Sequence, residues 1–120
     1  MTRFYKVYGE KKEPIIVRVC DSFWSKFFGL MLQKNIDPQE GILIQSKHES
    51  VTESAIHMFF MNFEISVFWI NRSFQIVDKS IAKPWRPAYF PKYPAMYVLE
   101  THSSQINKFE IGEKLIYRNV

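Results

Sequence analysis

The stretch that most constrains the fold is residues 57–71, HMFFMNFEISVFWIN, the most apolar part of the chain. A helix needs about 20 consecutive apolar residues to cross a membrane. This stretch is shorter than that and is interrupted by His57 and Glu64, which excludes a membrane span. In an extended chain both faces of the stretch would be mostly apolar, because successive side chains point to opposite sides of a strand. We therefore expect residues 55–61 and 63–70 to form two strands, or one long bent strand, covered on both sides.

The rest of the chain has the composition of a β-rich domain. Its 120 residues include 11 Phe, 6 Tyr and 3 Trp, and flat rings pack well on a pleated sheet. The length fits a single domain, residues 1–120. Runs of β-forming residues recur at short spacing, which is typical of a β-sandwich or barrel. We expect seven to eight strands, at residues 3–8, 15–20, 42–45, 55–61, 63–70, 74–81, 95–101 and 114–119.

One short helix is expected near residues 21–30, where aromatic residues recur at helical spacing. Asp21 or Ser22 can cap it, because a side-chain oxygen at that position accepts a hydrogen bond from a backbone N–H of the first turn. Gly29 ends the helix early. The polar residues 46–54 show no periodicity and predict a connecting loop.

Charge and cysteine content limit the choice of partner and compartment. The net charge is +4 and the pI is about 9.2, which permits nucleic acid, an acidic polymer or a membrane surface as partner and requires none of them. No motif of a nucleic-acid-binding module is present, so nucleic acid is not expected. The lone Cys20 excludes an intrachain disulfide and a zinc site built on cysteine pairs. The first residues lack the apolar segment of a signal peptide, so a cytoplasmic protein is expected.

The segment 82–94, AKPWRPAYFPKYP, contains four of the six prolines and cannot be a central strand, because proline lacks a backbone donor. From Lys79 to Leu99 the chain has basic residues and no acidic one. Aromatic rings interleaved with cations can stack on sugars or bases while the cations neutralise anionic groups. The alternative is a latch that closes one end of the sandwich. The candidate ligand-binding residues here are Lys83, Trp85, Arg86 and Tyr89, with Arg86 the strongest candidate for an anionic group.

Two further candidates are ionisable groups near apolar strands. His57 is either a hydrogen-bonded core residue or a pocket residue. Glu100 and His102 are two apart at the end of a predicted strand, where they form either a carboxylate–imidazole pair or a solvated strand end. A copper site of His57, Met58 and Met61 is disfavoured, because strand alternation turns Met58 away from the other two. No catalytic motif is found, and we expect neither a metal nor a cofactor.

Six blocks of the sequence resemble, in order and spacing, the domain-of-unknown-function 192 family of small, uncharacterised bacterial and archaeal proteins. The blocks are FFGLM (27–31), GILI (41–44), HMFFMNFEISVFWIN (57–71), KPWRP (83–87), AMYVLE (95–100) and IGEKL (111–115). The resemblance covers roughly residues 15–118 and implies a jelly-roll-like sandwich with one short helix. It implies no activity and no catalytic residues.

The chain departs from the pattern of that family at three positions. Ser66 stands where most members have Asp, Asn62 where many have Arg, and Ser104 where Gly is common. An acidic or arginine-dependent site of the family would therefore be altered here. The function expected first is a non-enzymatic binding or accessory module that holds an anionic or sugar-like ligand, or a protein partner, near loop 82–94. The alternatives are a small enzyme that uses His57 or His102 with Glu100, and a scaffold that acts through a sheet edge.

Overall fold

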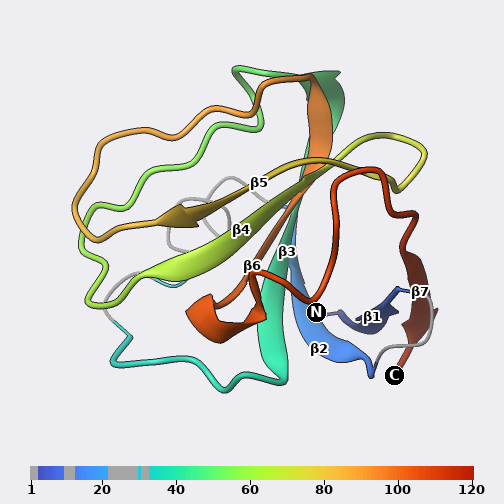
Figure 1. The fold of residues 1–120 in the computed structure, drawn as a ribbon, viewed down its shortest axis with the longest axis horizontal. Coiled ribbons are helices and arrows are strands. Elements are labelled where there is room, and N and C mark those ends of the chain that lie inside the picture. The colour runs from blue at the N-terminus through green and yellow to red at the C-terminus, as the bar shows by residue number, and fades with distance from the viewer. Residues whose placement is uncertain (1–2, 10–12, 22–29, 31–32) are drawn as a thin grey trace.

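The computed structural model describes residues 3–9, 13–21, 30 and 33–120, which form seven strands and one short 3-10 helix (Figure 1). The elements are β1 (Phe4–Tyr8), β2 (Ile15–Cys20), β3 (Glu40–Ser50), β4 (Ile65–Ile70), β5 (Ile76–Ala82), β6 (Ala95–His102), η1 (Ser103–Gln105) and β7 (Ile116–Asn119). The predicted mainly β fold is confirmed. The helix predicted near residues 21–30 falls on residues 22–29, which lie outside those the structure describes.

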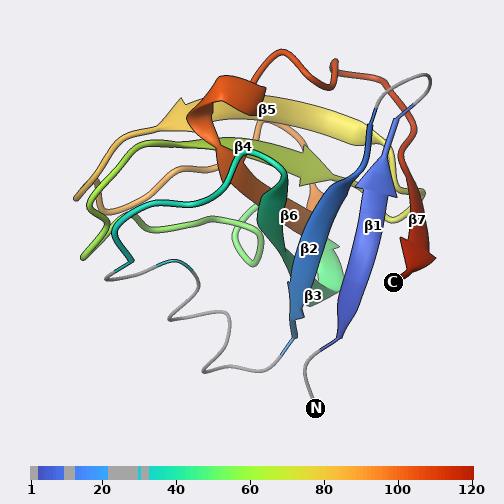
Figure 2. The same cartoon turned by 90° about the horizontal axis from the view of Figure 1, so that it is seen from below.

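All seven strands belong to one sheet, in the order β5-β4-β6-β3-β2-β1-β7. β1 and β2 are antiparallel, whereas β2 and β3 are parallel. The sheet twists, so that β4 and β5 run across β1 and β2 (Figure 1; Figure 2 shows the same fold from below). Residues 112–115 then bond to the chain around the start of β5, with Ile76 N–H donating to the Glu113 carbonyl at 2.9 Å. The segment before one edge strand, β7, thus pairs with the other edge strand, β5, which gives the sheet a barrel-like curvature.

Apolar side chains build a core on each face of this sheet, and β4 contributes to both because all its residues are buried. Phe68 points into one cluster, where its ring meets Phe109 edge to face at 5.4 Å between centroids. Trp69 points into the other cluster, and its Nε1–H donates to the Ser54 carbonyl at 2.8 Å. The second half of the apolar stretch is therefore a central strand covered on both sides, as predicted.

The strand predicted at residues 55–61 is wrong. Ile56 makes only an isolated bridge to Tyr89, and a turn follows. Met58 and Met61 are both buried in the same apolar cluster, although strand alternation predicts opposite faces. The reason is the turn at Phe60, whose φ of 60° breaks the alternation of an extended chain.

β3 is longer than predicted, because it continues through the polar residues 46–50 that were expected to be a loop. Its pairing with β6 shifts register between Gln45 and Ser50, and such an irregularity lets a strand bend while it stays paired. Within the described part of the chain, no helix has the length and apolar character needed to cross a membrane.

Candidate functional site

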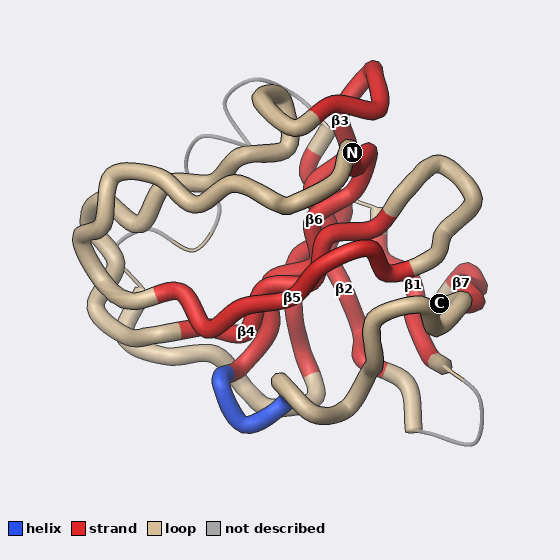
Figure 3. Tube along the Cα trace, turned by 45° about the horizontal axis from the view of Figure 1, so that its top comes forward, coloured by secondary structure: helices blue, strands red, loops and turns tan. Residues whose placement is uncertain are grey.

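Two loops lie side by side at one end of the sheet and form what we call the paired-loop surface, residues 56–61 and 83–90. The two segments run together as the green and orange chains of Figure 1 and as neighbouring tubes in Figure 3. Ile56 and Tyr89 exchange two backbone hydrogen bonds, of 3.0 and 2.9 Å. The loops are therefore held against each other by main-chain contacts as well as by side chains.

Two aromatic residues of this surface have a left-handed backbone, with φ of 60° at Phe60 and 67° at Trp85. Bulky residues rarely adopt this region, and holding one there costs on the order of 1–3 kcal/mol. Backbone bonds impose it at Trp85, whose N–H donates to the Met58 carbonyl at 2.7 Å, while Met58 N–H donates to the Arg86 carbonyl at 2.9 Å. The rings of Phe60 and Trp85 lie 5.0 Å apart and remain 46% and 55% exposed.

The loop that carries Trp85 also carries cationic residues. Lys83 and Arg86 are both exposed, and residues 79–99 include no acidic side chain. Phe90 and Tyr93 add further exposed aromatic rings along the same loop. The surface combines large apolar rings with positive charge, which suits a ligand that offers both flat faces and anionic groups.

Tyr89 has a different place from the other predicted residues of this loop. Its ring is half-buried against the apolar cluster that contains Trp69, and its hydroxyl accepts a hydrogen bond from Lys83 N–H at 2.8 Å. Further along, Lys92 N–H donates to Asp78 Oδ2 at 2.9 Å. Tyr89 therefore anchors the loop to the sheet, as in the latch interpretation, whereas Trp85 faces solvent.

Glu100 is buried within β6, with 6% of its surface exposed, between Ile42 of β3 and Val67 of β4. Burial in this apolar setting raises the pKa of its carboxyl to about 7. The prediction of a solvated strand end is wrong for this residue, because β6 continues to His102 and is paired on both sides.

The pair of Arg18 and Cys20, which the sequence did not single out, lies on the same face of the sheet as Glu100. Arg18 Nη1 donates to Cys20 Sγ at 3.4 Å. Burial raises the pKa of the Cys20 thiol, the Arg18 guanidinium lowers it, and the Glu100 carboxylate raises it. The sequence did contain a signal for this pair. In the strand expected at residues 15–20, IIVRVC, alternation places Arg18 and Cys20 on the same side.

The two histidines do not join Glu100 in one site. His57 Nδ1 accepts a hydrogen bond from Phe59 N–H at 3.2 Å. His102 Nδ1 accepts one from Ser104 N–H at 3.0 Å and thereby caps η1. In the part of the chain that the structure describes, no hydrogen bond links either imidazole to the Glu100 carboxyl, so the contacts assemble no carboxylate–imidazole pair.

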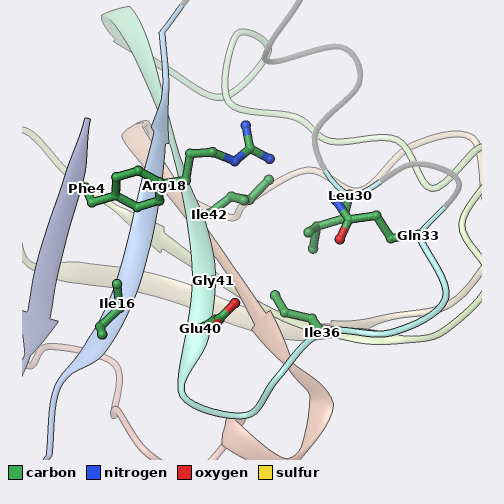
Figure 4. Close-up of a pocket in the computed structure, with 9 residues that line it drawn as sticks. All are labelled: Phe4, Ile16, Arg18, Leu30, Gln33, Ile36, Glu40, Gly41 and Ile42. Atoms are coloured by element: carbon green, nitrogen blue, oxygen red, sulfur yellow. The ribbon is translucent and has the colours of Figure 1, made fainter. Parts of the chain in front are cut away.

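A pocket of about 220 Å³ lies between strands β2 and β3 and the residues Leu30, Gln33 and Ile36 (Figure 4). Ile16 and Ile36 contribute apolar walls, and Arg18 is its cationic residue. No residue of loop 82–94 lines it. The candidate binding residues of the loop and this pocket are therefore separate features.

Fold and surface together define a small, mainly β domain with a twisted seven-stranded sheet and an exposed aromatic, basic surface. The chain belongs to the DUF192 family, whose model, described as "Uncharacterized ACR", matches residues 6–115. This confirms the resemblance seen in the six sequence blocks.

Relatives occur in archaea. The chain is 37% identical over 97 residues to UPF0127 protein TK1120 of Thermococcus kodakarensis, a match that covers 81% of this chain and 60% of that protein. It is 34% identical over 107 residues to UPF0127 protein PF1050 of Pyrococcus furiosus, covering 88% and 89%. The chain thus spans about 60% of the length of the Thermococcus relative.

Two crystal structures share the fold. A protein of unknown function from Novosphingobium aromaticivorans superposes with a TM-score of 0.80 at 13% identity, covering 96% of this chain and 84% of that one. A protein from Sinorhizobium meliloti superposes with a TM-score of 0.79 at 16% identity, covering 98% and 94%. At these identities the likeness concerns the fold alone.

The three residues expected to depart from the family pattern all make hydrogen bonds. Ser104 meets His102 Nδ1 through its backbone N–H at 3.0 Å and its hydroxyl at 2.8 Å. Ser66 is fully buried, and its hydroxyl lies 2.9 Å from the His102 carbonyl and 3.0 Å from the Ser103 carbonyl, to which it donates. Asn62 Nδ2 donates to the Gln33 carbonyl at 3.0 Å. Ser66 ties the end of β6 to β4, and Asn62 ties its loop to the segment before β3.

Proposed function

We propose that this domain is a non-enzymatic binding or accessory module that holds an anionic, sugar-like ligand on the paired-loop surface. The rings of Trp85 and Phe60 pack against the flat apolar faces of sugar rings. Arg86 and Lys83 pair with carboxylate or phosphate groups, since a planar guanidinium can bind such groups through two parallel hydrogen bonds.

The observation that carries the proposal is the exposed ring of Trp85. A latch buries its aromatic ring, as Tyr89 does in the same loop. Trp85 instead is 55% exposed and stacked on Phe60, in a backbone conformation that disfavours a bulky residue. Exposed apolar patches often mark interaction sites, and backbone strain is often retained for function.

Charge favours an anionic ligand over a neutral one. The net charge of +4 and the absence of acidic side chains in residues 79–99 attract anions and repel cations. A protein with an acidic surface is the competing occupant, and the test below separates the two. An enzyme built on Glu100 and a histidine gains no supporting contact among the described residues. For location we propose the cytoplasm, where a lone cysteine stays reduced.

Retention on three immobilised polymers tests the proposal: polygalacturonate, which is an anionic sugar polymer, dextran, which is a neutral one, and polyglutamate, which is anionic without sugar rings. We expect retention to be strongest on polygalacturonate. Equal retention on polyglutamate would favour an acidic protein partner and contradict the sugar-like ligand. Wild-type protein that passes through all three columns unretarded would contradict the proposal as a whole.

Variants locate the binding surface. Trp85→Ala should weaken binding by roughly 5- to 150-fold, because a stacked ring contributes about 1–3 kcal/mol to the binding free energy. Arg86→Ala should weaken binding mainly at low salt, where charge attraction is least screened. Arg72→Ala is the matched control, because Arg72 is also exposed but lies in the turn between β4 and β5. Equal binding by all three variants and wild type would show that the loop is a latch.

A further inference from the structure

A second pocket, of about 170 Å³, lies on the face of the sheet opposite Glu100. Its floor is apolar, with Val19 of β2 and Leu43 of β3, both nearly fully buried. No residue of the paired-loop surface lines it. It is therefore separate from the site of the proposed function, and its residues are all among those the structure describes.

Four aromatic rings from four segments of the chain wall this pocket: Tyr5 of β1, Tyr97 of β6, Tyr117 of β7 and Phe74, which precedes β5. Each ring meets the next edge to face. The centroid distances are 5.5 Å for Tyr5–Tyr117, 5.1 Å for Phe74–Tyr117 and 5.2 Å for Phe74–Tyr97. Rings that contact one another in this way are held in place, and they offer both faces and edges to a further ring.

Phe74 is the central ring of this group and has a left-handed backbone, with φ of 62°. The turn before β5 imposes it, since Phe74 N–H donates to the Asn71 carbonyl at 3.0 Å and Leu115 N–H donates to the Phe74 carbonyl at 2.9 Å. A bulky residue in this region is strained. The strain places a large ring where it contacts both Tyr97 and Tyr117.

Besides the three tyrosines, the polar residues that line the pocket are Arg3 and Gln45, and none of the lining residues carries a carboxylate. Arg3 contributes a guanidinium that also pairs with Asp21, and Gln45 contributes a side-chain amide. Both residues also line an adjoining hollow of about 350 Å³, to which Lys47 adds a second cation and Asp21, the partner of Arg3, a carboxylate. A guanidinium has five N–H donors, so the pairing with Asp21 leaves Arg3 able to donate to a ligand.

These features define the chemistry of a ligand. The volume is below the roughly 300–1,000 Å³ of sites for drug-sized ligands, which limits the occupant to about one ring. The walls favour an aromatic ring, packed edge to face like its neighbours. The Arg3 guanidinium and the lack of a lining carboxylate favour an anionic group beside Arg3 and disfavour a cation.

We infer that the pocket between Tyr5, Phe74, Tyr97 and Tyr117 is a binding site for a small aromatic carboxylate. The aromatic ring of the ligand lies among the four protein rings, over Leu43. Its carboxylate lies beside Arg3 and Gln45 and accepts hydrogen bonds from both. Lys47 in the adjoining hollow adds to the attraction for the anion.

Isothermal titration calorimetry of the wild-type chain with four compounds tests the ligand class. Benzoate and 4-hydroxybenzoate should each bind saturably at one site. Cyclohexanecarboxylate has the same charge without an aromatic ring and should bind about 2- to 12-fold more weakly. Benzylamine, an aromatic cation, should not bind. Absence of saturable binding by both aromatic acids, or binding of benzylamine as tight as theirs, would overturn the inference.

Four variants locate the site. Tyr117→Leu removes an exposed wall ring and should weaken benzoate binding about 2- to 12-fold. Arg3→Gln should weaken it about tenfold or more, because a hydrogen bond to a charged group is lost. Phe4→Leu and Arg72→Gln are matched controls at exposed positions that do not line the pocket and should bind as wild type. Circular dichroism verifies the fold of each variant, and folded Tyr117→Leu and Arg3→Gln proteins that bind like wild type would refute the site.

Discussion

Replacing Glu100 by Gln should change how the stability of this protein depends on pH. The carboxyl lies within β6, and its burial raises its pKa to about 7 from the ordinary value of 4.5. Between these two pH values the folded state keeps a proton that the unfolded state releases. The folded state therefore binds more protons than the unfolded state in this window, and stability falls as pH rises through it.

The size of the effect follows from the two pKa values. A difference of one pKa unit corresponds to 1.36 kcal/mol, so the shift of Glu100 corresponds to about 3 kcal/mol of stability. This contribution is fully present below about pH 4.5 and is lost by the time the pH exceeds about 7. The amide of Gln does not titrate, so the variant lacks this loss. The free energy of unfolding of Glu100→Gln should rise relative to wild type by about 3 kcal/mol between pH 4 and pH 8.

Urea unfolding at a series of pH values, followed by tryptophan fluorescence, measures this difference. Any cost of burying the amide is independent of pH and cancels when the two ends of the series are compared. Glu64→Gln, at an exposed carboxyl, is the matched control for the exchange of carboxyl for amide and should follow the wild-type curve. A difference between Glu100→Gln and wild type that is the same at pH 4 and pH 8 would refute the reasoning from burial.

Three further substitutions test particular contacts. Trp85→Gly should be more stable than Trp85→Ala by about 1 kcal/mol in thermal unfolding, since a left-handed backbone costs less for glycine. If the Ala variant is the more stable one, the left-handed conformation at position 85 is contradicted. Ser66→Ala should lower the free energy of urea unfolding by about 1–2 kcal/mol, because it leaves the His102 carbonyl without this donor; no loss would show that the bond contributes nothing. Gly41→Ala would place a Cβ 2.7 Å from the Glu100 carbonyl oxygen and should cost about 1–3 kcal/mol in the same assay, whereas wild-type stability would contradict the close approach of β3 and β6.

The strands were largely predictable because their signals are local. Residues 65–70 are β-branched or aromatic at almost every position, and both faces are apolar. The turn at Phe60 was not predictable in the same way, because turns are usually marked by glycine, asparagine or proline. Here a phenylalanine takes the left-handed conformation, and backbone bonds between Met58 and the loop around Trp85 hold the neighbouring chain in place.

The candidate sites depend on contacts between distant segments, which a single sequence does not specify. Glu100 follows an apolar run, as a solvated strand end would, and its burial comes from the pairing of β6 with β3 on one side and β4 on the other. Loop 82–94 was found from its prolines and its aromatic and basic residues, but the partner ring at Phe60 was missed. The four rings around Phe74 come from four segments, and none of their local patterns indicates that they meet.

The binding role of the paired-loop surface is tested most directly by a titration of wild-type protein with oligogalacturonate, followed through the indole N–H signals in NMR spectra. Trp85 is exposed on that surface, while Trp69 is buried and its Nε1–H is bonded to the Ser54 carbonyl. Binding at the paired loops should shift the Trp85 signal in a saturable way, leave the Trp69 signal in place, and give no shift with a neutral oligosaccharide of the same length. A Trp85 signal that stays unchanged at saturating oligogalacturonate would contradict the proposed function.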